Sequence, residues 1–171
     1  MDVKLIQVPE DQFESLCMNR DAVRDALGEA DRDPDRCLVL QETWPAIHFT
    51  LTGEVPIPRE EAMRRGIRWD DDSLENALLG GTTTPFRSSL GPARCLWPEQ
   101  VARIARQLDA VGIDGFRDRF DPADLEQEGI PPPGWREEPE RADRLAAAFA
   151  EFLRFYREAA AHGEGVLIVF I

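Results

Sequence analysis

The stretch Gly165–Ile171, which reads GVLIVFI, decides the fold class of this chain. A short run that is nearly all apolar is typical of a central β-strand buried on both faces. Val3–Val8, which reads VKLIQV, is rich in β-branched residues and stops at Pro9, so it predicts another short strand. Pairing of these two strands would bring the two ends of the sequence together.

The clearest helical pattern lies within Cys37–Gly53. Its apolar face follows the spacing i, i+3, i+4 and i+7 and consists of Trp44, Ile47, His48 and Leu51. Pro45 is tolerated only in the first turn of a helix, so the helix is expected to begin near Trp44. Gly53 predicts its end, because glycine readily adopts the left-handed conformation that closes a helix.

Further helices are expected on both sides of this segment. The longest is predicted over Glu140–His162, where apolar residues follow 4-3-4 spacing and Gly163 marks the end. Gly28 and Gly112 predict the ends of two earlier helices.

The stretch between the central helices has a different character. Thr82–Leu96 lacks helical spacing, and residues 86–90 and 93–96 look extended. The sequence contains no repeat and no long linker. We therefore predict a single α+β domain over residues 1–171, with several helices packed on a small sheet that includes the N- and C-terminal strands.

The composition excludes several classes of partner. The 171 residues include 20 Lys and Arg against 33 Asp and Glu, which gives a formal net charge of −13. Nucleic acids and anionic membranes bind clustered Lys and Arg, so we expect no nucleic-acid partner and no membrane partner. The hydrophobic fraction of 43% is that of a globular chain and not of a disordered one.

The cysteines favour a cytoplasmic location. Cys17, Cys37 and Cys95 are odd in number, far apart and without a C-x-x-C motif, so we expect three reduced thiols. The residues after Met1 show no apolar run behind a basic region, and we predict no signal peptide. The longest apolar run, Val166–Ile171, is too short to span a bilayer.

No motif in the sequence predicts catalysis. His48 and His162 are the two histidines and lie on different predicted helices, so we expect no transition-metal site. No serine lies in a G-x-S-x-G elbow, and no phosphate-binding loop is present. Arg94 beside Cys95 would lower the pKa of the thiol, but an inert cysteine on a half-buried strand is the preferred interpretation. We assign no catalytic residue, no metal and no cofactor, and leave open whether the protein is an enzyme.

The tryptophan helix is part of a longer pattern. Leu40–Gly53 reads LQETWPAIHFTLTG and resembles the helix L-D-K-x-W-x-x-[IL]-H-[FY]-x-L-T-G of the YfbM-like family, a bacterial domain of unknown function. Other segments similar to the family are Ala77–Gly81, Leu90–Leu96, Pro98–Val101, Asp121-Pro122 and 129–132. The chain departs from the family at Gln41-Glu42, where Asp-Lys is usual, and at Pro131, where tyrosine is usual. The resemblance covers most of the chain and implies an α+β fold, but it implies no activity.

Two functions are compatible with these features. The one we favour from the sequence is a non-enzymatic module that binds a protein partner or forms a homo-oligomer, as acidic immunity proteins bind basic toxins by charge complementarity. The alternative is a small-ligand-binding protein, or an enzyme, with a pocket near the tryptophan helix. Trp44 and Trp135 would provide flat contacts, His48 a titratable group, and Arg94 a clamp for an anion. For each of these four side chains, packing in the core is the competing interpretation.

Overall fold

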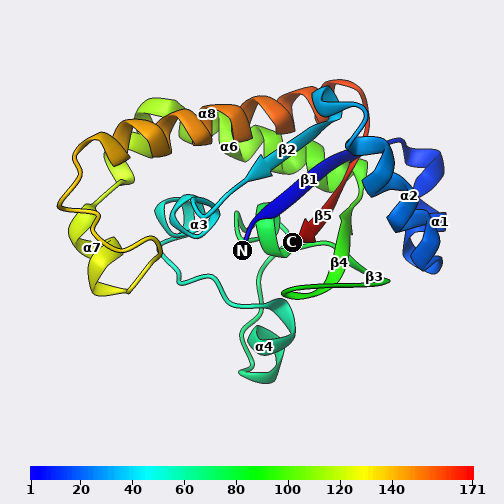
Figure 1. Ribbon diagram of the computed structural model, residues 1–171, viewed down its shortest axis with the longest axis horizontal. Helices are drawn as coiled ribbons and strands as arrows, with labels where there is room; N and C mark the ends of the chain where they lie inside the picture. Colours follow the sequence, from blue (N-terminus) through cyan, green and yellow to red (C-terminus); the bar gives the residue numbers. More distant parts are fainter.

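The computed structural model describes all residues from Met1 to Ile171 and shows eight helices packed on one antiparallel sheet. The strands lie in the order β2-β1-β5-β4-β3 (Figure 1). Their bounds are β1 Val3–Val8, β2 Cys37–Leu40, β3 Thr82–Ser88, β4 Gly91–Leu96 and β5 Gly165–Phe170. The predicted α+β class is confirmed.

The helices are mostly short, with two long exceptions. Their bounds are α1 Phe13–Met18, α2 Arg20–Ala30, α3 Trp44–Thr52, α4 Arg59–Arg64, α5 Asn76–Leu79, α6 Pro98–Arg119, α7 Pro122–Gln127 and α8 Glu140–Ala161. The long helices α6 and α8 run together across one side of the molecule (Figure 1). None of the eight is both long enough and apolar enough to cross a membrane.

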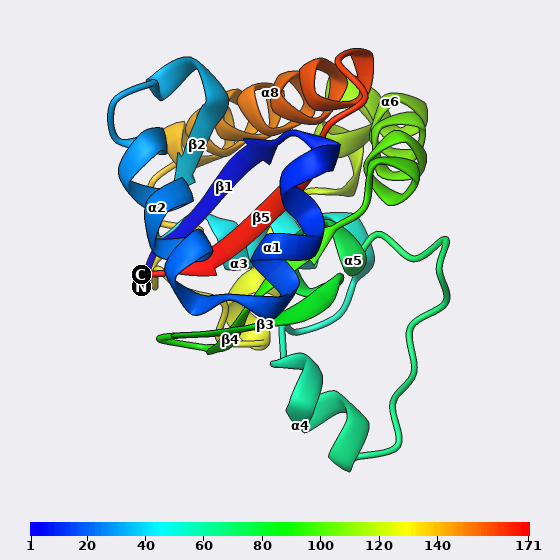
Figure 2. The ribbon, with the colours of Figure 1, turned by 90° about the vertical axis from the view of Figure 1, so that its right-hand side faces the viewer.

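The terminal strands pair with each other. β1 and β5 are antiparallel neighbours, with Val3 opposite Phe170. The backbone N–H of Asp2 donates to the carbonyl of Ile171, and that of Ile171 donates to the carbonyl of Asp2, both at 2.9 Å. The two ends of the chain therefore lie side by side (Figures 1 and 2), as the sequence predicts.

Both faces of the sheet are covered, because alternate residues of a strand point to opposite sides. Val3 and Leu5 of β1 belong to a core cluster of 29 buried residues that includes α3, α6 and α8. Ile6 and Val8 belong to a cluster of 11 that includes α1 and α2. Figure 2 looks onto the sheet from the side of α1 and α2, with α6 and α8 above it. Strand β5 is buried along its whole length, as its apolar sequence predicts.

Two predicted boundaries are wrong. Helix α2 continues past Gly28 to Ala30, because Ala26 and Ala30 extend its buried face by another turn. The strand expected over residues 86–90 begins earlier, where three β-branched threonines start β3 at Thr82. By contrast, Gly112 has a φ of 63° and interrupts α6 where the sequence predicts a helix end.

Helix α4 projects from the body of the molecule (Figures 1 and 2). Ala62 is its one buried residue, and α4 has no extensive contact with another helix or strand. Glu60 forms an ion pair with Arg94 of β4, which ties the projection to the sheet. Residues 54–75, hereafter the α4 segment, form this excursion between α3 and α5.

Candidate functional site

His48 lies on the inner face of α3. Pro45 occupies the first turn, and Gly53 ends the helix with a φ of 73°, so both predicted boundaries of α3 are confirmed. The apolar face of α3 packs into the main core and carries His48 with it, leaving the residue 2% exposed. Burial lowers the pKa of the imidazole from 6.5 to about 4, so the ring is neutral at pH 7. Its Nδ1 atom is enclosed and has no hydrogen-bond partner.

The imidazole lines a cavity of about 330 Å³ between α3 and the α4 segment. This volume falls at the lower end of the range of small-molecule sites. The wall facing α3 combines charged, aliphatic and aromatic side chains: Glu54, Val55, Ile57, Ile67, Arg68, Trp69 and Glu75. Polar and apolar groups are both present, as a ligand site requires, and the polar share is higher than in most small-molecule sites.

Local hydrogen bonds shape the far wall of this cavity. The Asn76 side chain donates to the carbonyls of Asp70 and Ser73, at 2.8 and 3.0 Å, and so closes the turn that precedes α5. Ser73 also donates to the carboxylate of Glu75. The guanidinium of Arg59 lies 5.9 Å from the ring centroid of Trp69, a cation–π arrangement. These contacts position Glu75 and Trp69 from opposite ends of the α4 segment.

The two tryptophans expected at the site lie elsewhere. Trp44 is buried, donates to the carbonyl of Met1 at 3.2 Å and meets Phe170 edge-on. Trp135 is buried, donates to the carbonyl of Ile130 at 2.8 Å and has Arg141 over its ring. Neither tryptophan lines the cavity that His48 lines.

Arg94 also lies outside the lining of that cavity. Its guanidinium donates to the carbonyl of Gly81 at 3.1 Å and pairs with Glu60. The side chain of Arg94 is 8% exposed and that of Glu60 42%. The structure thus places Arg94 as the anchor of α4, with its charge already matched by a carboxylate.

The structure shows neither a cluster of metal ligands nor an activated thiol. No group of three or more His, Cys, Asp and Glu side chains is placed to hold a metal ion. Cys95 is fully buried, deeper than the half-buried strand position expected from the sequence, and burial raises the pKa of its thiol. A thiol held protonated in this way is a poor nucleophile.

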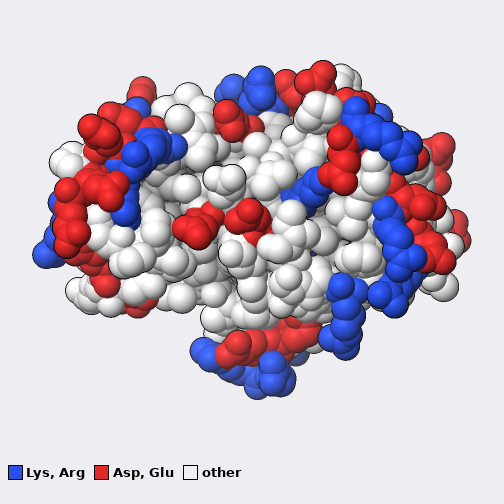
Figure 3. Space-filling view, viewed as in Figure 1, with Lys and Arg blue, Asp and Glu red and all other residues white.

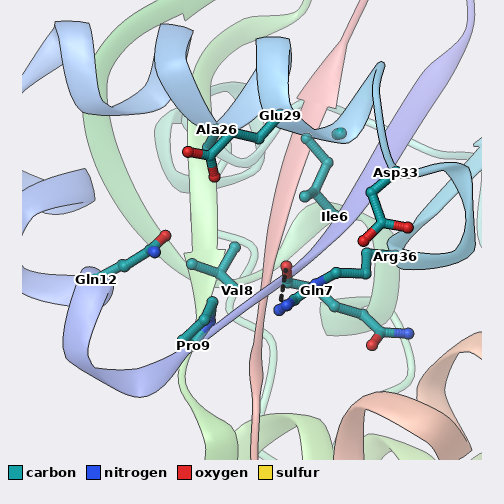
Figure 4. Close-up of a pocket in the computed structure, with 10 residues that line it drawn as sticks. Ile6, Gln7, Val8, Pro9, Gln12, Ala26, Glu29, Asp33 and Arg36 are labelled. Atoms are coloured by element: carbon teal, nitrogen blue, oxygen red, sulfur yellow. Dashed lines mark hydrogen bonds between the residues drawn. The ribbon is translucent and has the colours of Figure 1, made fainter.

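A second hollow lies on the other face of the sheet, between β1 and α2 (Figure 4). Its volume is about 140 Å³, well below the range of small-molecule sites. Arg36 reaches the carbonyl of Gln7 at 3.4 Å and pairs with Glu164 at 2.8 Å. The carboxylates of Glu29 and Asp33 line the same space (Figure 4). Its size and its neutralised arginine make it a weaker candidate than the His48 cavity.

Comparison with known proteins identifies the family. The model of a domain of unknown function, DUF1877, matches residues 1–169. The chain belongs to this family. Among solved structures, it is similar to YfbM of Escherichia coli, a protein of unknown function, with 20% identity, a TM-score of 0.66 and 100% coverage of both chains. The resemblance to the YfbM-like family is confirmed, and the likeness to that structure shows the fold alone. No curated protein matches the chain.

Of the residues that line this cavity, the sequence predicts His48 but not the residues of the opposite wall. Arg68, Trp69 and Glu75 belong to no motif that predicts a ligand site. One local signal was available: the proline-containing loop 54–58 directly follows α3, and its residues Glu54, Val55 and Ile57 line the cavity with His48. It indicates a cavity wall only once the path of the chain is known.

Proposed function

We propose that the protein binds a small molecule in the His48 cavity. The observation that carries the proposal is a buried imidazole whose Nδ1 atom lacks a partner, on the edge of a cavity large enough for a ligand. An unpartnered buried polar atom costs about 1–3 kcal/mol, and such atoms are rare in folded proteins. Because Nδ1 is enclosed, a ligand in the cavity recovers part of that cost only when the wall around the ring opens.

The lining indicates the chemistry of this ligand. Glu54 and Glu75 outnumber Arg68, so the local formal charge is negative and disfavours an anion. Val55, Ile57 and Ile67 offer apolar contacts, and Trp69 offers a flat ring. The ligand is therefore an uncharged or cationic molecule with one polar edge for His48 and an apolar face.

A thermal-shift screen tests this proposal with three proteins: wild type, His48→Gln and the matched control His162→Gln, whose residue is exposed. The panel contains nucleosides, sugars, amides and amines. A ligand at 100 times its Kd stabilises the fold by about 2.7 kcal/mol, which raises the melting temperature measurably. We expect a hit that shifts wild type and His162→Gln but not His48→Gln. A flat screen on folded protein, or a hit that His48→Gln leaves unchanged, would contradict the proposal.

The protein-partner or self-association module stays a second proposal, resting on the acidic composition. Its net charge of −13 would attract a basic partner. Affinity capture from a native lysate in low and high salt tests it, because a charge-driven partner is lost at high salt. The cytoplasmic location that the three unpaired cysteines favour belongs to the same proposal.

A further inference from the structure

Besides the His48 cavity and the hollow between β1 and α2, the structure has another cavity, which we call the second cavity. It lies on the other side of the wall formed by Ile67, Arg68 and Trp69. Its volume is about 360 Å³, and its other lining residues are Arg59, Ala62, Met63 and Gly66. Two arginines line it, and no carboxylate does. The His48 cavity shares the same wall but has two glutamates, so the two hollows have opposite electrostatic character.

Both arginines of this second cavity are free of ion pairs. Twelve of the 20 basic residues of the chain pair with a carboxylate, but Arg59 and Arg68 do not. The two acids of α4 are engaged elsewhere, Glu60 with Arg94 and Glu61 with Arg65. Figure 3 shows acidic and basic atoms side by side on this projection. The cavity thus holds two unmatched positive charges in a protein that is acidic overall.

Apolar surface adjoins these charges. Met63 is 69% exposed and Ile67 41% exposed, and both line the cavity. Trp69 is half-buried, with one face covered by Arg59. Exposed apolar side chains grouped around a hollow mark a surface that a ligand can cover. An occupant that matches this surface carries a negative charge at one end and an apolar body at the other.

We propose that this cavity binds a small amphipathic carboxylate, held by Arg59 and Arg68 through its charge and by Met63, Ile67 and Trp69 through its body. A guanidinium presents paired N–H donors in the geometry of a carboxylate, and such charge-assisted bonds are the strong ones. Burial lowers the pKa of Arg94, the charge of Glu60 raises it, and the charge of nearby Arg59 lowers it. Glu60 is thus engaged by Arg94 and is not available to Arg59.

This site goes beyond the proposed function, because it lies on the other side of the shared wall and takes an anion, where the His48 cavity takes an uncharged or cationic molecule. Its ligand is selected by the arginines and not by His48. Binding at one cavity can therefore fail while binding at the other holds.

The probe for the test is phenylacetate, with its uncharged amide phenylacetamide as the size-matched comparison. Binding is followed by two-dimensional NMR of the tryptophan indole N–H groups, four signals of which Trp69→Phe identifies one. The proteins are wild type, Arg59→Gln, Arg68→Gln and the control Arg64→Gln, which lies on α4 but does not line the cavity.

We expect saturable movement of the Trp69 signal with phenylacetate in wild type, in Arg64→Gln and in His48→Gln. Loss of a charge-assisted bond should weaken binding tenfold or more in Arg59→Gln and in Arg68→Gln. Because Trp69 lines both cavities, the two probes are compared in His48→Gln, where the imidazole of the other cavity is absent. Equal binding of phenylacetamide and phenylacetate in His48→Gln, wild-type affinity in Arg59→Gln and Arg68→Gln, or no saturable movement would overturn the proposal. His48 does not line the second cavity, so phenylacetate binding that survives in His48→Gln is assigned to the second cavity and not to the His48 cavity.

Discussion

The α6–α8 pair and the α4 segment differ in how much packing holds them. Helix α8 buries eight residues, and its Phe149 stacks on Phe116 of α6 at 4.1 Å between ring centroids. Helix α4 buries Ala62 alone and is tied to the sheet by the ion pair between Glu60 and Arg94. Helix α3, which carries His48, belongs to the same core as α8. The His48 cavity therefore has one firm wall and one wall that can move away from it.

The largest expected effect comes from a substitution in the tightly packed α6–α8 interface. Phe149→Ala removes a buried ring from the α6–α8 interface and should lower the free energy of unfolding by about 3–5 kcal/mol. Met63→Ala removes an exposed side chain from α4 and should change it by less than about 0.5 kcal/mol. Urea denaturation followed by circular dichroism measures both. Similar losses in the two variants would show that the two regions are equally packed.

The next effect depends on pH. Burial lowers the pKa of His48 from 6.5 to about 4, so the unfolded chain binds this proton more tightly than the folded chain. The free energy of unfolding is therefore not reduced by His48 above pH 6.5, and it falls as the pH drops from 6.5 toward 4. Between pH 7 and pH 5 this group alone should remove about 2 kcal/mol.

Urea denaturation at pH 7 and pH 5 isolates that contribution. The loss of stability should be about 2 kcal/mol smaller in His48→Gln than in wild type, because glutamine does not titrate. His162→Gln should retain the full loss attributed to His48. Equal losses in His48→Gln and wild type would mean that His48 is open to water in the folded protein.

The fold and the site differ in how far the sequence could predict them. The terminal strands and α3 were predictable because their signals are local: an apolar run, and a helical spacing between a proline and a glycine. Arg94 was predictable as a polar group on a strand, but its partner Glu60 lies 34 residues away in the sequence. No periodicity reports such a pairing.

The tryptophans show the same limit. The indole of Trp44 donates to the Met1 carbonyl, and that of Trp135 to the Ile130 carbonyl. Whether a tryptophan donates to a carbonyl or lines a cavity depends on the three-dimensional path of segments that are distant in the sequence. The sequence alone could not distinguish Trp69, at a cavity wall, from these two anchors.

The smallest expected effect comes from the ion pair between Glu60 and Arg94, which holds α4 to the sheet. Glu60→Gln leaves the guanidinium of Arg94 without its carboxylate, and should lower the free energy of unfolding by about 1–2 kcal/mol because Glu60 is partly exposed. Trypsin should also cleave faster at Arg64 and Arg65 as α4 loosens. Glu61→Gln removes a more exposed pair on the same helix and serves as the control. Cleavage and stability equal to those of Glu61→Gln would mean that Arg94 does not anchor α4.

Native-state hydrogen exchange tests the central claim most directly, namely that the α4 segment is the movable wall of the His48 cavity. The amides of α4, and that of the wall residue Ile67, which donates to the carbonyl of Ala62, should exchange through local opening at a free energy of about 2 kcal/mol or less. Those of α8 should exchange near the global value, about 5–15 kcal/mol for a domain. Opening free energies in α4 that equal those of α8 would contradict the claim, because both walls would then open only when the whole protein unfolds.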